Sequence, residues 1–139
     1  MLPTHIQLDM VSRERALVNK QVDELQLPGA KGYLGVLPGH TPMLVSLHVG
    51  ELWYRQGGEM HYLSIALGFA EIQPDRVTVL AQIAEPAQEI DVARAEAAKK
   101  RAEERLSRAT ADMDWERARV ALMKAMARLQ VASKATTKS

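Results

Sequence analysis

Glycine and proline are confined to the first part of this chain. All 8 Gly and all 6 Pro lie within the first 86 residues, whereas the 53 residues that follow contain 14 of the 20 Ala. Gly and Pro favour turns and interrupt helices, and Ala has the highest helix propensity of all residues. The sequence therefore predicts a turn-rich domain over residues 1–86 and a helical domain over residues 87–139.

The remaining composition excludes several classes of protein. The chain has no Cys, which rules out disulfides, thiolate zinc sites and cysteine nucleophiles. No stretch approaches the roughly 18 consecutive apolar residues of a membrane-spanning helix, and the first residues lack the pattern of a signal peptide. Aromatic residues make up only 4%. We therefore expect a cytosolic location and a core of aliphatic side chains.

Short strand-like segments separated by turn residues fill the first 86 residues. Residues 5–11 alternate polar and apolar side chains, as a strand with one buried face does. Further segments follow at residues 22–27, 44–49, 51–56, 60–67, 69–73 and 76–81, and Gly50 and Gly68 divide two pairs of them. Gly57-Gly58 is typical of a two-residue hairpin turn. Eight or more strands at this spacing predict an antiparallel β-sandwich or flattened barrel.

Helical periodicity begins after Pro86. Apolar residues recur every three or four positions in one stripe at residues 95, 98, 102, 106 and 109, and in a second at 115, 118, 122, 126 and 129. Asp91 is placed to cap the first helix, and residues 110–114 form a polar break between the stripes. So short a connection predicts an antiparallel two-helix hairpin.

Charge is also divided between the two parts. Residues 1–89 carry a net charge of −4 and residues 90–139 a net charge of +5. Basic residues share one face of each helix: Arg94, Arg101, Arg105 and Arg108 on the first, and Arg117, Lys124 and Arg128 on the second. If both faces line one groove, they form an anion site suited to phosphates; the alternative is an ordinary solvated surface. Few aromatic residues interleave with these charges, so base stacking on a nucleic acid is poorly supported.

No catalytic or metal-binding motif is present in the sequence. The four His, at positions 5, 40, 48 and 61, are not spaced as metal ligands. Glycine recurs at positions 29, 32 and 35 around Lys31, but the Gly-Lys-Ser/Thr ending of a phosphate loop is missing. We therefore predict no catalytic residue and no metal site.

Three motifs, in order along the chain, resemble the epsilon subunit of F-type ATP synthases. They are Gly-Tyr-Leu-Gly-Val-Leu-Pro-Gly-His-Thr-Pro at residues 32–42, Gly-Phe-Ala-Glu-Ile-Gln-Pro at 68–74 and Ile-Asp-Val-Ala-Arg-Ala at 90–95. The resemblance covers essentially the whole chain. It implies a mostly β N-terminal antiparallel β-sandwich of about ten strands, followed by a C-terminal antiparallel two-helix hairpin.

The resemblance also implies a function and partners. It suggests a non-catalytic subunit of the central rotor stalk, which joins the gamma subunit to the c-subunit ring and couples proton-driven rotation to ATP synthesis. The helices of bacterial members extend toward the alpha and beta subunits and inhibit ATP hydrolysis. No cofactor is required, and ATP is a regulatory ligand. The implied location is the cytoplasmic face of the bacterial plasma membrane, reached only through the complex, with no nucleic acid bound.

Site residues follow from the resemblance position by position. The expected ATP contacts are Glu85, Asp91, Arg94, Arg101, Lys124 and Arg128. Lys124 stands where tightly binding relatives have Arg, and since Lys offers no planar fork we expect weaker ATP binding. Lys31, Tyr33 and His40 are the residues expected to contact the c-ring and gamma. Two alternatives from other classes are a free-standing ATP-binding sensor and a basic-helix adaptor protein.

Overall fold

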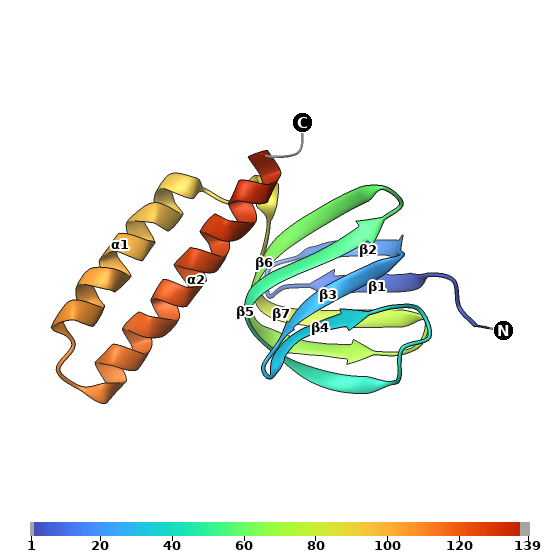
Figure 1. Cartoon of the computed structure of the whole chain (residues 1–139), viewed down its shortest axis with the longest axis horizontal. Helices are drawn as coiled ribbons and strands as arrows, with labels where there is room; N and C mark the ends of the chain where they lie inside the picture. The colour runs from blue at the N-terminus through green and yellow to red at the C-terminus, as the bar shows by residue number, and fades with distance from the viewer. Residues whose placement is uncertain (1, 137–139) are drawn as a thin grey trace.

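The computed structural model describes residues 2–136, which form a β-sandwich with a helical hairpin beside it (Figure 1). Within these residues there are seven strands: β1 (Ile6–Val11), β2 (Ala16–Val22), β3 (Glu24–Gly29), β4 (Gly32–Val36), β5 (Met43–Gln56), β6 (Glu59–Ile72) and β7 (Arg76–Pro86). A 3-10 turn, η1 (Ala87–Glu89), leads to helices α1 (Val92–Arg108) and α2 (Asp112–Thr136). The predicted fold class is confirmed. Residue 1 and residues 137–139 of the two predicted domains lie outside the described residues.

The strands hydrogen-bond in the order β2-β1-β7-β6-β5-β3-β4. β1 and β7 are parallel, and the other neighbours are antiparallel. The predicted alternation on β1 is confirmed, because Ile6, Leu8 and Met10 are completely buried in the core. Aliphatic side chains dominate that core, and Tyr54 is its one aromatic member within the described residues. Burial raises the pKa of the Tyr54 phenol, which favours its neutral form.

Two expected strand breaks fall inside long continuous strands. We predicted separate strands at residues 44–49 and 51–56, and at 60–67 and 69–73, but β5 and β6 are each continuous over 14 residues. The pairing of β6 with β5 and with β7 is interrupted at Leu67 but keeps its register, and Leu67 and Gly68 adopt positive φ values of 65° and 144° there. Glycine there bends β6 without ending it. These two continuous strands account for part of the difference between the seven strands observed and the ten expected.

The strand β2 was missed by the sequence analysis. Residues 16–22 show little alternation, with Val18 and Val22 buried and the positions between them exposed. Their strand character comes from pairing with β1 rather than from a local pattern. The predicted segment 22–27 is divided at Asp23, so that Val22 ends β2 and Glu24 begins β3.

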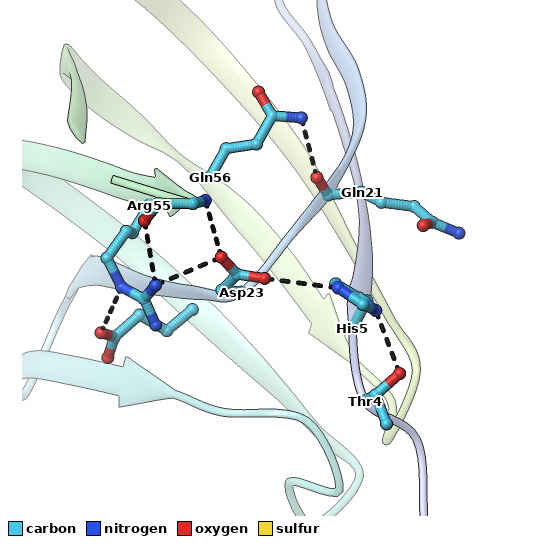
Figure 2. Close-up of polar contacts among 8 residues, drawn as sticks. Thr4, His5, Gln21, Asp23, Arg55 and Gln56 are labelled. Atoms are coloured by element: carbon cyan, nitrogen blue, oxygen red, sulfur yellow. Dashed lines mark hydrogen bonds and ion pairs between the residues drawn. The ribbon is translucent and has the colours of Figure 1, made fainter. Parts of the chain in front are cut away.

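A polar network around Asp23 joins three segments of the sandwich (Figure 2). One oxygen of its carboxylate accepts the Gly57 N–H at 2.7 Å and lies 3.2 Å from Nη1 of Arg55. The other lies 3.5 Å from Nε2 of His5. Arg55 also donates to Oε1 of Glu24 at 3.0 Å. The network therefore ties the segment before β1 and the β2–β3 link to the β5–β6 turn.

The helical hairpin begins where predicted. The Asp91 side chain caps α1 by accepting the Arg94 N–H at 3.0 Å, as an N-cap residue does. The α1 stripe is confirmed, since Ala95 and Ala102 are buried. Figure 1 shows α2 between α1 and the sandwich.

The predicted α2 stripe is only partly right. Its buried residues are Ala118, Ala125 and Ala132, seven positions apart, together with Val131. Trp115 and Met126, which we expected to be buried, are 48% and 51% exposed. Small side chains therefore occupy the covered positions of both helices. They allow the helices to pack closely but bury little apolar area.

Candidate functional site

A cavity of about 260 Å³ lies between the hairpin and the sandwich. Strands β5, β6 and β7 form one wall, and both helices form the other. The lining is mostly apolar, with small alanines on the helical side at positions 98, 121 and 125. Three of the predicted ATP contacts, Glu85, Lys124 and Arg128, also line it.

The Arg128 guanidinium is held by Glu85 across this cavity. Its Nε lies 2.7 Å from Oε1, and Nη2 donates to Oε2 at 3.3 Å. Both side chains are more than two-thirds buried, so the pair is partly shielded from solvent. A phosphate that binds Arg128 must therefore share this guanidinium with the Glu85 carboxylate.

The other three predicted ATP contacts lie outside the cavity. Asp91 and Arg94 are exposed at the first turn of α1, where Asp91 acts as the helix cap. Arg101 borders a separate, open hollow of about 410 Å³ near the α1–α2 connection. Arg105, Arg108 and Asp114 line the same hollow.

Among the described residues, the basic faces of the two helices line separate hollows rather than one groove. Residues on α1 line the hollow at the hairpin tip, whereas Lys124 and Arg128 face the sandwich. On α2, Val131 and Ala132 pack with Ala87 and Ile90, and Arg128 reaches Glu85 on β7.

The three residues predicted to contact the rotor lie at different places along β4. Lys31 is exposed in the β3–β4 turn, and Tyr33 is 58% exposed near the start of β4. His40 lies in the loop beyond the other end of β4, and its Nδ1 is 2.7 Å from the Thr41 carbonyl oxygen. Figure 1 shows this turn and this loop at opposite ends of the strand. The structure brings Lys31 and Tyr33 together, but not His40.

Tyr33 is fixed in position by the neighbouring strand. Its hydroxyl accepts the Glu51 N–H at 3.3 Å. A Cβ atom on Gly50 would stand 2.9 Å from that hydroxyl and 2.8 Å from the Pro28 Cβ. Glycine at this position therefore leaves the room that the phenol needs.

An ion pair between the sandwich and the end of α2 was not predicted from the sequence. Glu51 is only 8% exposed, and one of its carboxylate oxygens lies 2.8 Å from Nζ of Lys134. The same Nζ is 4.7 Å from the centre of the Tyr62 ring, which is a cation–π distance. The partners are separated by 83 residues. The one local signal is a carboxylate that precedes the apolar Leu52 and Trp53 in a strand.

An exposed apolar row was also missed. Val11 on β1 pairs with Leu80 on β7, and Leu80 pairs with Phe69 on β6. These neighbours are 37%, 51% and 55% exposed. Three apolar side chains in register across three strands form a continuous patch on the outer surface, which we call the apolar row. Such patches mark contact surfaces for other proteins.

Other chemistry has little support within residues 2–136. No group of three His, Asp or Glu in this range is arranged to hold a metal ion. No helix in the described part of the chain is long and apolar enough to cross a membrane. The side-chain hydrogen bond from Arg119 lowers the pKa of Glu116, and the same contact raises the pKa of Arg119. This exposed pair lies near the start of α2.

The fold and these surfaces define a two-part subunit, a β-sandwich that carries a helical hairpin on one side. Residues 5–87 match the family model for the β-sandwich domain of the ATP synthase delta/epsilon chain, and residues 88–133 match the model for its long α-helix domain. The chain therefore belongs to the ATP synthase delta/epsilon chain family. The resemblance read from the three motifs is confirmed.

Relatives match over almost their whole length. The ATP synthase epsilon chain of Syntrophobacter fumaroxidans is 47% identical over 93% of this chain and 96% of its own. Epsilon chain 2 of Syntrophotalea carbinolica is 45% identical over 93% and 94%, respectively. A chain in the structure of Euglena gracilis mitochondrial ATP synthase superposes with a TM-score of 0.83, at 24% identity, over 96% of this chain and 84% of that chain. That likeness shows the fold.

Proposed function

We propose that this chain is a non-catalytic subunit of the central rotor stalk of an F-type ATP synthase. Residues 1–86 act as the docking domain that joins gamma to the c-subunit ring, and they transmit proton-driven rotation to the alpha–beta hexamer. Residues 87–139 act as the regulatory domain. The subunit works at the cytoplasmic face of the bacterial plasma membrane, held there by the complex. The curated relatives, which are named ATP synthase epsilon chains, support this function over a basic-helix adaptor.

The observation that carries the proposal is the apolar row. A sandwich that only supported its own hairpin would have no need for Val11, Leu80 and Phe69 at its surface. A constitutive subunit contact fits them, because it removes this apolar area from water. We assign the row to gamma. The exposed Lys31 and Tyr33, at the β3–β4 turn, are assigned to the c-ring, with His40 as a contact from the other end of β4.

The hairpin is suited to leave the sandwich. Its apolar contact is a small cluster of Ala87, Ile90, Val131 and Ala132, with Tyr62 and Ala135 at its border, separate from the sandwich core. We propose that the released helices inhibit ATP hydrolysis by binding gamma and the alpha and beta subunits. The basic residues of the helices fit an acidic segment of beta.

Removal of the hairpin tests the inhibitory role. A chain that ends at Pro86 keeps all of β7 and is expected to assemble with gamma. If the hairpin holds half of the complexes inhibited, ATP hydrolysis rises about twofold, and more if it holds a larger share. The measurement is the steady-state ATPase rate of the complex with the full and the shortened chain. Equal rates would remove inhibition from the proposal and leave the stalk role intact.

ATP is the proposed regulatory ligand of the docked hairpin. The apolar wall and the charges of Glu85, Lys124 and Arg128 suit a ligand with an apolar ring and an anionic group. Binding would favour the docked state, because the cavity exists only while hairpin and sandwich are together. The volume of about 260 Å³ lies just below the usual range for ligand sites, which agrees with weak binding.

A gain of affinity tests the ATP site. Lys124→Arg supplies a planar fork for phosphate at the cavity and is expected to tighten ATP binding roughly tenfold. The measurement is isothermal titration calorimetry of the full chain with ATP. Lys99→Arg makes the same change on α1, outside the lining of the cavity, and serves as the matched control. Absence of heat at millimolar ATP in both variants would end the ATP proposal.

A further inference from the structure

The hairpin is attached to the sandwich mainly along one helix. Figure 1 shows α1 on the far side of α2, and α2 contacts β5, β6 and η1. Alanines contribute much of the apolar contact, at positions 87, 132 and 135. Side chains this small bury little apolar surface, so their contact stabilises docking weakly. The polar contacts across this interface therefore contribute a large part of the free energy that keeps the hairpin docked on the sandwich.

Within the described part of the chain, two ion pairs link α2 to the sandwich, and they differ in burial. In Glu85–Arg128 the carboxylate side chain is 29% exposed, whereas in Glu51–Lys134 it is 9% exposed. Lys134 reaches Glu51 with distances of 2.8 and 3.1 Å to the two oxygens and lies over the Tyr62 ring. A carboxylate this deeply buried requires a cation more than an exposed one does.

We propose that Glu51 and Tyr62 form a receptor site on the sandwich for the last turns of α2, with Lys134 as the residue that occupies it, and that Tyr33 links this site to the β3–β4 turn. We call Glu51, Tyr62 and Lys134 the latch. While the hairpin is docked, Lys134 compensates the Glu51 carboxylate. When the hairpin lifts, water takes that role. The Glu51 carboxylate is therefore compensated both in the docked state, by Lys134, and in the undocked state, by water. In a partly lifted hairpin it would have neither, so docking is cooperative.

The link through Tyr33 follows from one hydrogen bond and one close approach. The Tyr33 hydroxyl accepts the Glu51 N–H, and the phenol packs closely against Gly50, in the space that a Cβ atom would occupy. A displacement of the Tyr33 ring therefore alters the backbone that carries the Glu51 carboxylate. Linkage is reciprocal, so docking at the latch also restrains Tyr33. That this turn meets the c-ring rests on the proposed function; the link itself lies within this chain.

The test measures docking in the isolated full chain. Because the chain has no Cys, Gln73→Cys and Ser107→Cys introduce a unique pair of exposed positions, on the sandwich and on α1, for a donor and an acceptor dye. Single-molecule energy transfer then gives the ratio of undocked to docked molecules. Lys134→Met strands the buried Glu51 carboxylate and is expected to raise this ratio roughly tenfold or more. Glu51→Gln is expected to raise it less, because the amide oxygen still accepts from Lys134.

The double variant and two controls decide the interpretation. If the latch is one unit, Glu51→Gln with Lys134→Met raises the ratio by less than the product of the single effects. Lys134→Arg keeps the cation and is expected to stay docked. Glu116→Gln breaks an exposed ion pair elsewhere on α2 and is expected to change nothing. A ratio for Lys134→Met within twofold of the native value, in a chain with native circular dichroism, overturns the latch.

Tyr33→Phe tests the link separately. Loss of the hydroxyl is expected to raise the undocked ratio about threefold in the native background and less in the Lys134→Met background. Equal effects in both backgrounds would show that Tyr33 and the latch act independently. These measurements need no gamma, ring or ATP, so failure of the rotor assignment would leave their outcome unchanged.

Discussion

Phe69→Glu is expected to weaken the binding of this subunit to gamma by roughly 100-fold, which corresponds to about 2.7 kcal/mol. Phe69 lies at one end of the apolar row, next to Leu80, and is 55% exposed. A carboxylate at this position would have to lose its water on binding, without a cation among its neighbours in the row. The measurement is the dissociation constant of purified gamma and the full chain, by surface plasmon resonance.

Val92→Glu is the matched control for this prediction. Val92 is an apolar residue of similar exposure, 48%, at the start of α1, where a negative charge is favourable. With the hairpin docked, it is expected to bind gamma as the native chain does, since Val92 is not part of the apolar row. Native affinity in a correctly folded Phe69→Glu variant would contradict the assignment of the apolar row to gamma.

The hairpin could be predicted because its signals are local. A cap at Asp91 and alanines at helical spacing lie within one or two turns of each other, and both operate before any tertiary contact forms. The same holds for the Gly57-Gly58 turn, which closes the pair Gln56–Glu59 in the structure. Family membership could be predicted because three motifs occur in the family's order.

The strand count could not be predicted, because a glycine can either end a strand or lie within a continuous one. Gly50 and Gly68 both read as breaks, yet Gly50 admits the Tyr33 phenol and Gly68 admits the backbone of β7. Only the neighbouring strand distinguishes a break from a bend. The residues that fill these spaces are 17 and 12 positions away in sequence, beyond any local pattern.

The candidate site shows the same limit at longer range. Sequence spacing placed Arg101, Lys124 and Arg128 on helical faces, and each does lie on its expected helix. Which hollow each face lines depends on how α2 is rotated about its axis, and the side of α2 that carries Val131, Ala132 and the two interface ion pairs contacts η1 and the sandwich. Glu51 and Lys134 had no local signal that one would pair with the other, so the contact most relevant to docking could be found only in three dimensions.

Gly68→Ala is expected to lower the free energy of unfolding by at least about 3 kcal/mol. Gly68 has a φ of +144°, a conformation that L side chains rarely adopt. A Cβ atom would stand 2.1 Å from the Leu80 carbonyl oxygen and 2.8 Å from the Ala81 Cα. Both are backbone atoms of β7, so the clash can be relieved only by separating β6 from β7 beside the core. The measurement is the urea midpoint, followed by circular dichroism.

Gly35→Ala is the control that separates this clash from a general intolerance of side chains at strand glycines. Gly35 lies in β4 without a positive φ, and a Cβ atom there meets no other heavy atom within 4 Å. The substitution removes flexibility from the unfolded chain at no steric cost, so the expected change in unfolding free energy is zero to a gain of about 1 kcal/mol. If both variants lost the same unfolding free energy, the loss at Gly68 could not be attributed to its close approach to β7. A loss of unfolding free energy at Gly68 alone would show that β6 is continuous because Gly68 has no Cβ atom. This continuous strand connects the apolar row to the hairpin interface.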